Sequence, residues 1–149
     1  MLALCLCLLA LTSCENIFGS VEDSGKVTVV VEEADGSFSK FDLDLSLLEN
    51  KSEGGKGVLE HLSQQKDGLY LEMVDSSYGA YVVAIGNIKE NLSEGLYVMC
   101  YTSAKADSYE GAPTIQYSDR TLYMSGVGLS FMTVEAGGVI LFRLEKSPY

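Results

Sequence analysis

Runs of alternating or β-branched apolar residues predict strands along most of the chain. Residues 26–32 (KVTVVVE) are β-branched, and residues 38–45 (FSKFDLDL) place Phe41, Leu43 and Leu45 on one face. Because Glu33-Ala34-Asp35-Gly36 between them has turn composition, the two runs predict a β-hairpin. Similar runs predict six further strands, at 69–74, 81–85, 96–102, 121–124, 129–134 and 139–144.

One segment has helical periodicity. In residues 58–62 (VLEHL), Val58, Leu59 and Leu62 recur at i, i+1 and i+4, which predicts a short helix after a loop over 47–57. Residues 103–119 (SAKADSYEGAPTIQYSD) have loop composition and exceed the usual loop length of compact domains, so function is expected there. The expected fold class is α+β, with a mostly antiparallel sheet and one short helix.

The N-terminus differs from the rest of the chain. Eleven of residues 1–13 (MLALCLCLLALTS) are hydrophobic and none is charged. This run is too short to span a membrane but fits the apolar region of a signal peptide. Residues 14–25 (CENIFGSVEDSG) are polar with Gly and Ser, as expected of a tether, and the folded domain is expected over 26–149.

Leu11-Thr12-Ser13-Cys14 resembles the lipobox of bacterial lipoproteins. The resemblance implies cleavage before Cys14 and acylation of that residue, for example with palmitate. It also implies an extracytoplasmic location at the bacterial cell membrane or envelope. Buried acyl carbons contribute about 0.8 kcal/mol each, so two or three chains would anchor the protein firmly.

Four stretches of the domain resemble a known family. These are 27–36 (VTVVVEEADG), 57–62 (GVLEHL), 78–88 (YGAYVVAIGNI) and 134–140 (VEAGGVI). They are similar to bacterial lipoprotein domains related to the C-terminal domain of transcobalamin and intrinsic factor. The resemblance implies a single β-grasp (ubiquitin-like) domain over 26–149 and cobalamin as a possible ligand. The chain departs from the family in lacking Trp and in its long 103–119 segment, so no cobalamin contact can be assigned to a residue.

The net charge of the chain limits the kinds of molecule that it can bind. With 21 acidic and 10 basic residues the net charge is −11, which argues against binding nucleic acid and favours solubility and repulsion from anionic lipid. The acidic pairs and clusters do not have the spacing of a calcium loop, so no metal site is expected. We interpret Asp42 and Asp44 as a solvated strand face, and 32–35 as the hairpin turn.

No motif indicates catalysis. Cys100 lies in an apolar strand and the sole histidine is His61, expected as a partly exposed helix residue, so a Cys–His or Ser–His nucleophile is not predicted. No pair of carboxylates is singled out for acid–base hydrolysis. Gly54-Gly55-Lys56-Gly57 lacks the spacing of a phosphate loop, so we expect a flexible loop there. The chain is therefore expected to bind a ligand and not to be an enzyme.

Tyrosines are the best candidates for ligand contact, because the chain has nine of them and no Trp. Tyr97 and Tyr101 share one face of a predicted strand, whereas Tyr109 and Tyr117 lie in the long segment. Such rings can receive a flat ligand, a glycan or a partner protein, although sheet packing is the alternative for the first two. The predicted function is a lipid-anchored, non-enzymatic binding module. The alternatives are a corrinoid-binding lipoprotein and an accessory subunit of an envelope assembly that binds protein through a sheet edge or the long segment.

Overall fold

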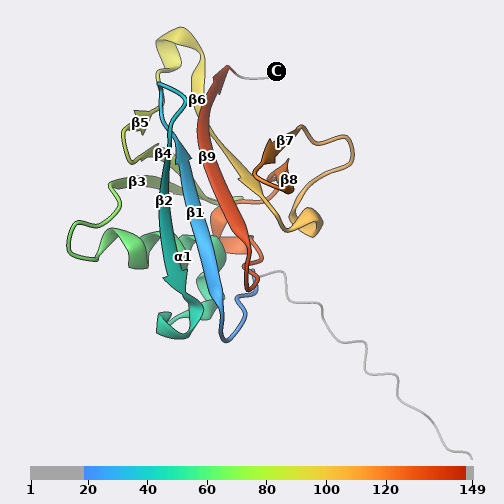
Figure 1. The fold of residues 1–149 in the computed structure, drawn as a ribbon. Helices are drawn as coiled ribbons and strands as arrows, with labels where there is room; N and C mark the ends of the chain where they lie inside the picture. The colour runs from blue at the N-terminus through green and yellow to red at the C-terminus, as the bar shows by residue number, and fades with distance from the viewer. Residues whose placement is uncertain (1–18, 147–149) are drawn as a thin grey trace, which may run out of the picture.

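A computed structural model of the chain describes residues 19–146 (Figure 1). The predicted signal peptide and Cys14 lie outside these residues. One α-helix is present in them, α1 (Gly54–Ser63), with short 3₁₀ helices that include η4 (Lys105–Asp107) and η5 (Leu129–Phe131). The strands are β1 (Lys26–Glu32), β2 (Phe38–Asp44), β3 (Leu71–Ser76), β4 (Gly79–Ile85), β5 (Ile88–Lys89), β6 (Leu96–Thr102), β7 (Thr114–Tyr117), β8 (Arg120–Met124) and β9 (Val139–Lys146).

The strands form two sheets. The larger has the order β2-β1-β9-β6-β8-β7, and the smaller has the order β3-β4-β5. All pairings between these strands are antiparallel except β1 with β9, in which Thr28 to Val31 run parallel to Val139 to Phe142. The α+β class with one short helix is confirmed, and the larger sheet is mixed.

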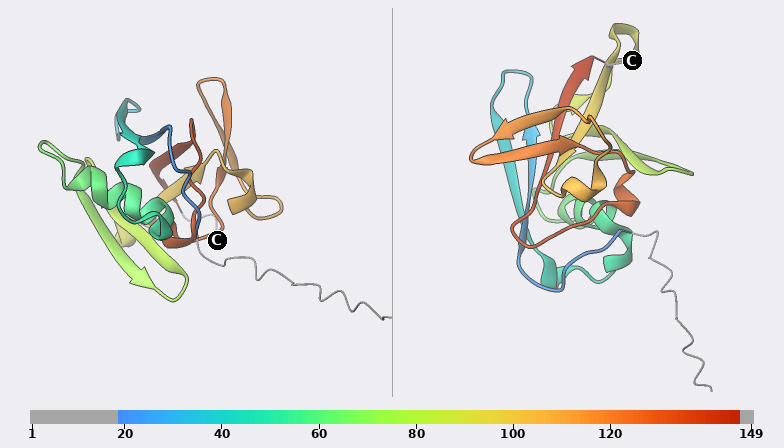
Figure 2. Two further views of the ribbon diagram at one scale, coloured as in Figure 1. Left: turned by 90° about the horizontal axis from the view of Figure 1, so that it is seen from below. Right: turned by 90° about the vertical axis from the view of Figure 1, so that its right-hand side faces the viewer.

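Each face of the larger sheet covers a hydrophobic core. On one face, α1 and the small sheet pack over alternate residues of β1 and β9, such as Val29 and Phe142 (Figures 1 and 2). On the other face, Val30 and Leu141 pack with Tyr117 and Leu122 of the β7–β8 hairpin. Strands β1 and β9 contribute side chains to both cores. Both faces of β1 therefore need apolar residues, which explains its run of valines.

The first hairpin forms as predicted. Lys26 pairs with Asp44 and Glu32 with Phe38, and Leu43 is buried while Asp42 and Asp44 are exposed. The turn is closed by a hydrogen bond from the amide of Ser37 to the Asp35 carboxylate (2.9 Å).

The glycine-rich segment 54–57 is not the flexible loop that the sequence predicted, because it forms the first turn of α1. A Cβ on Gly54 would lie 2.5 Å from the Met132 carbonyl oxygen, and one on Gly55 would lie 3.1 Å from the Met132 sulfur. Gly54 also has a positive φ of 52°. The glycines therefore allow α1 to approach the backbone that follows η5.

Two other predicted boundaries are wrong. Residues 129–134 are not a strand, because Leu129–Phe131 form the 3₁₀ turn η5. This turn places Leu129 and Met132, three residues apart, both in the core. Residues 103–119 are not one long loop, since they contain η4 and β7. Polar and apolar residues alternate in Thr114–Tyr117 over only four positions, which is a weak sequence signal. This segment forms strand β7 because it pairs with β8 across a turn at Ser118.

The domain also begins earlier than Lys26. Val21 forms a parallel bridge with Val134, and the amide of Glu22 donates to the Val134 carbonyl oxygen (3.0 Å). Gly19 is buried, with no space for a Cβ beside Met132. Residues 19–25, predicted as part of a tether, are therefore packed on the domain. No helix within residues 19–146 is long and apolar enough to span a membrane.

Candidate functional site

The structure does not bring the four candidate tyrosines together in one pocket. Tyr97 is 37% exposed on β6, whereas Tyr101 on the same face is 2% exposed and its hydroxyl donates to the Glu145 carboxylate (3.0 Å). Tyr109 is 39% exposed, and its hydroxyl lies 3.5 Å from the Met124 sulfur. Tyr117 is 9% exposed and packs edge-on against Phe38. Tyr101 and Tyr117 are thus mainly core residues.

Cys100 and His61 lie on different elements and line different cavities. Cys100, on β6, borders an apolar cavity of about 160 Å³ with Met99 and Met124. Burial raises the pKa of its thiol far above the usual range, so the reactive thiolate is disfavoured. His61 is half-buried on α1 beside an open polar pocket that includes Glu53 and Glu60.

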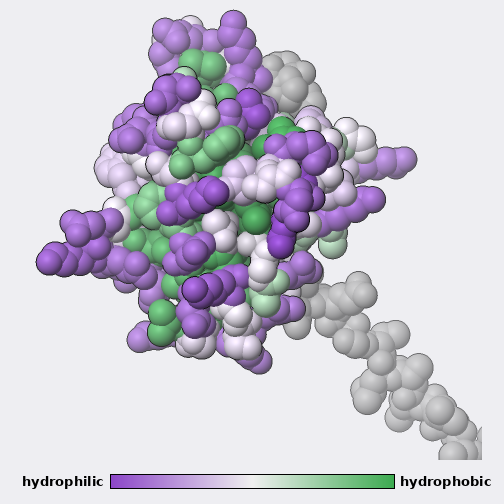
Figure 3. Space-filling view, viewed as in Figure 1, coloured by the Kyte–Doolittle hydropathy of each residue, from purple (hydrophilic) through white to green (hydrophobic). Residues whose placement is uncertain are grey.

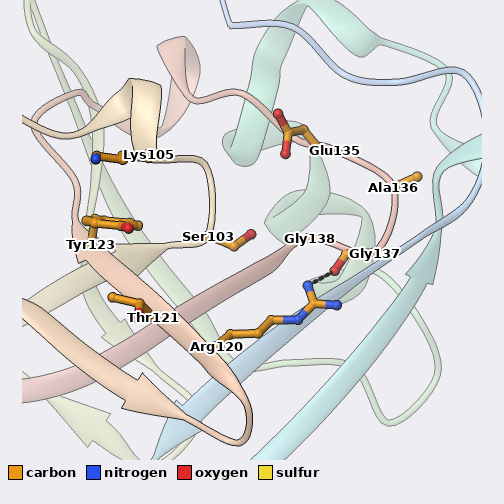
Figure 4. Close-up of a pocket in the computed structure, with 9 residues that line it drawn as sticks. All are labelled: Ser103, Lys105, Arg120, Thr121, Tyr123, Glu135, Ala136, Gly137 and Gly138. Carbon is orange, nitrogen blue, oxygen red and sulfur yellow. Dashed lines mark hydrogen bonds between the residues drawn. The ribbon is translucent and has the colours of Figure 1, made fainter.

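A polar pocket of about 440 Å³ lies between β8 and the turn that leads into β9 (Figure 4). The Arg120 side chain extends from the start of β8 to the Gly137 carbonyl oxygen, to which it donates a hydrogen bond. Lys105 and Tyr123 lie at the opposite end, where the Lys105 ammonium is 5.7 Å from the centre of the Tyr123 ring. We call this the cationic pocket; its lining is Ser103, Lys105, Arg120, Thr121, Tyr123, Glu135, Ala136, Gly137 and Gly138.

Hydrogen bonds fix the walls of the cationic pocket. The Ser103 hydroxyl oxygen accepts from the amide of Val139 (2.9 Å), and the amide of Gly138 donates to the Glu135 carbonyl oxygen (2.9 Å). Gly137 adopts a φ of 74°, and its amide donates to the Lys26 carbonyl oxygen (2.6 Å). The Gly137–Gly138 turn therefore forms one side of the pocket.

A second pocket of about 380 Å³ adjoins the first and shares Arg120 and Gly137 with it. Lys26 and Lys40 contribute its basic side chains, and the Lys40 ammonium is 5.4 Å from the centre of the Tyr117 ring. Asp42 and Asp119 also line it, so this second pocket is of mixed charge. In Figure 3, hydrophilic and hydrophobic residues are interspersed over the side of the molecule that Figure 1 shows.

The bases of the cationic pocket lack acidic partners. Lys51, Lys56, Lys89 and Arg143 each have a carboxylate oxygen within 4.0 Å. Lys105 and Arg120 form no ion pair with any residue of the described part of the chain, and the same is true there of Lys26, Lys40, Lys66 and Lys146. The lining of the pocket thus holds two bases, Lys105 and Arg120, and one acid, Glu135, in a protein of net charge −11. The arrangement can bind an anion through an Arg fork, a Lys charge and hydroxyl groups.

Sequence reasoning missed Lys105 and Arg120. Two features of the sequence could have pointed to them. Basic residues are scarce, ten among 149, so each one is a candidate for binding an anion, and Gly137-Gly138 marks a turn that could border a site. Sequence separation hides the site, because Arg120 meets Gly137 only through the sheet order that places β8 near the start of β9. Among residues 19–146, no group of three or more His, Cys, Asp or Glu side chains is arranged to hold a metal ion.

Comparisons with known proteins inform the fold. No protein-family model matches the chain, and no curated protein matches it. A crystal structure from Ruminococcus gnavus, described as a "putative metal binding protein", superimposes with a TM-score of 0.53 at 13% identity. The match covers 83% of this chain and 98% of that one. At this identity the similarity shows that the two proteins share a fold, and it carries no information on a ligand.

Proposed function

We propose that the protein is a lipid-anchored, extracytoplasmic and non-enzymatic binding module that holds an anionic ligand in the cationic pocket. The observation that carries the proposal is the placement of Arg120 and Lys105 beside one pocket of about 440 Å³, in which neither base forms an ion pair and Glu135 is the one acidic lining residue. The volume is within the range of small-molecule sites. The leader and the lipobox-like Leu11–Cys14 support the anchor and the location.

The ligand should be small and bear an oxyanion such as carboxylate or phosphate. The net charge of −11 repels anions at long range, so binding must come from short contacts inside the pocket. Arg120 offers several donors, Lys105 a point charge, and Ser103 and Thr121 hydroxyl groups. Glu135 at the rim disfavours large polyanions, because they would place charge beside its carboxylate.

We further propose that the domain is of the β-grasp type. The support is the opening β1–β2 hairpin, the short helix that follows it, and the last strand β9, which returns parallel to β1. The resemblance to the transcobalamin-related lipoprotein domains stays a prediction, and with it the alternative of a corrinoid ligand. The role as an accessory subunit of an envelope assembly likewise stays a prediction.

Acylation tests the anchor. When cells that express the protein are fed a clickable fatty acid, we expect label on the wild-type chain and none on a Cys14→Ala variant. A Cys100→Ala variant is the matched control and should be labelled like wild type, because Cys100 lies within the folded domain. Equal labelling of wild type and Cys14→Ala would refute anchoring at this residue.

Calorimetric titration tests the ligand site. The chain from residue 14 onward with Cys14→Ser contains every described strand and both cores, and it would be titrated with inorganic phosphate, glucuronate and cyanocobalamin. We expect an oxyanion to bind, and Arg120→Gln or Lys105→Gln to weaken it at least tenfold, since a charged hydrogen bond contributes about 1.5–3 kcal/mol. The control is Lys66→Gln, an exposed lysine after α1. If cyanocobalamin binds, and binds with the same affinity to wild type, Arg120→Gln and Lys105→Gln, the corrinoid alternative would be favoured.

A further inference from the structure

Packing of residues 19–25 on the domain determines where a lipid on Cys14 would be attached. Gly19 is buried against the backbone at Met132, and Val21 bridges to Val134. Four residues lie between Cys14 and Gly19, so their Cα atoms are five residue steps apart and at most about 18 Å from each other. The surface around Met132 and Val134 would therefore lie close to the membrane.

The cationic pocket borders this attachment point. Its wall at 135–138 directly follows Val134, and the amide of Ala136 donates to the Glu22 carboxylate (2.7 Å). On the other side of Glu22, the carbonyl oxygen of Ser20 accepts from the amide of Val134 (2.7 Å). The right-hand view of Figure 2 shows the segment after Gly19 running past the loop that leads into β9. One turn is thus held by the N-terminal segment and also lines the pocket.

We infer that the ligand of the cationic pocket is the phosphate group of a phospholipid in the membrane to which the chain is attached. The inference rests on the proposed function, because it needs both the anchor at Cys14 and an anion in the pocket. Arg and Lys are the usual partners of phosphate oxygens. A short attachment presents the pocket with headgroups at high effective concentration, so weak individual contacts suffice.

The charge distribution agrees with a single contact region. An anionic chain is repelled by anionic lipid over most of its surface, whereas in the pocket lining the two bases Lys105 and Arg120 outnumber the single acid Glu135 and favour an anion. The bound headgroup would then fix which side of the domain faces the bilayer.

Two measurements test the inference. First, the Cys14→Ser chain from residue 14 onward is titrated with glycerophosphocholine, a soluble phosphodiester headgroup, and with inorganic phosphate. Second, the acylated protein is inserted into vesicles of phosphatidylcholine or of digalactosyldiacylglycerol, a bilayer lipid without phosphate, and amide hydrogen exchange is followed. We expect glycerophosphocholine to bind, and the amides of Ala136–Gly138 to exchange at least threefold more slowly in the phospholipid vesicles alone.

Variants separate this inference from the proposed function. Arg120→Gln should abolish both the binding and the extra protection, whereas Lys66→Gln should preserve them; thermal melting checks that each variant is folded. Binding of inorganic phosphate without binding of glycerophosphocholine, and with equal exchange in both vesicles, would overturn the headgroup but retain an anion site. Binding of no anion by the soluble chain would overturn both proposals.

Discussion

At the scale of single residues, Asp107 is the polar side chain with the clearest structural role. It is 7% exposed, and its carboxylate accepts from the amide (2.7 Å) and the hydroxyl (3.0 Å) of Thr133. Its own carbonyl oxygen accepts from the amide of Gly126 (2.8 Å). Asp107 therefore joins η4 to two loops, and one of these continues into the wall of the cationic pocket.

Replacing Asp107 should destabilise the fold and change its pH dependence. Asp107→Ala leaves two donors of Thr133 unpaired, so we expect a loss of about 1–3 kcal/mol in the free energy of unfolding, measured with urea. Glu110→Ala, at an exposed position, is the control and should change it by less than about 0.5 kcal/mol.

The pH dependence of the same site has a definite sign. Burial raises the pKa of Asp107 above its ordinary 3.8, although the hydrogen bonds from Thr133 oppose the shift. The native state therefore binds this proton more tightly than the unfolded chain, and stability from this group falls as pH rises from 3.8 through the raised pKa. Relative to Asp107→Asn, wild type should gain stability on acidification across that interval. A difference between the two that is constant with pH would contradict the assignment.

At the scale of elements, the contact between α1 and η5 depends on Gly54. Gly54 and Gly95 both have positive φ, 52° and 68°, but a Cβ added at Gly54 would meet neighbouring backbone, whereas one added at Gly95 would have nothing within 4 Å. Gly95→Ala should cost about 1–2 kcal/mol for the left-handed backbone alone. Gly54→Ala should cost roughly 1–3 kcal/mol more, because the added methyl group meets the Met132 carbonyl oxygen and because the Gly54 backbone (φ 52°, ψ −134°) lies outside the left-handed helical region that Gly95 adopts. Urea unfolding of the two variants measures this difference, and equal losses would show that the contact is not tight.

The same contact shows what the sequence could and could not predict. Strands 26–32 and 96–102 agree with β1 and β6 to the residue, because β-branched and apolar runs are local signals. The start of α1 at Gly54 was missed, since glycine is a poor helix former. Glycine is needed at this position because the backbone of Met132 leaves no room for a Cβ, and that contact is invisible in the sequence. The cationic pocket was missed for a similar reason: its members come from three separate segments that only the sheet order brings together.

At the scale of the whole molecule, net charge should limit stability. Self-repulsion among an excess of eleven negative charges destabilises the compact state, and salt screens it. Raising sodium chloride from low to about half-molar concentration should raise the free energy of unfolding by roughly 1 kcal/mol, or the Tm by about 4 °C. Thermal melting measures this. Sodium phosphate at equal ionic strength should add a further increase that Arg120→Gln removes, whereas a Tm insensitive to salt would show that repulsion is unimportant.

The parallel pair of β1 and β9 also governs when the protein can fold. Strand β1 is synthesised well before β9, yet Thr28 to Val31 can complete their pairing only with Val139 to Phe142. A β1–β2 hairpin by itself is marginally stable, and contacts so distant in sequence form slowly. For a chain exported behind a signal peptide, as we propose, the centre of the sheet would stay open until β9 has crossed the membrane. For such a chain, the topology itself would delay folding during export.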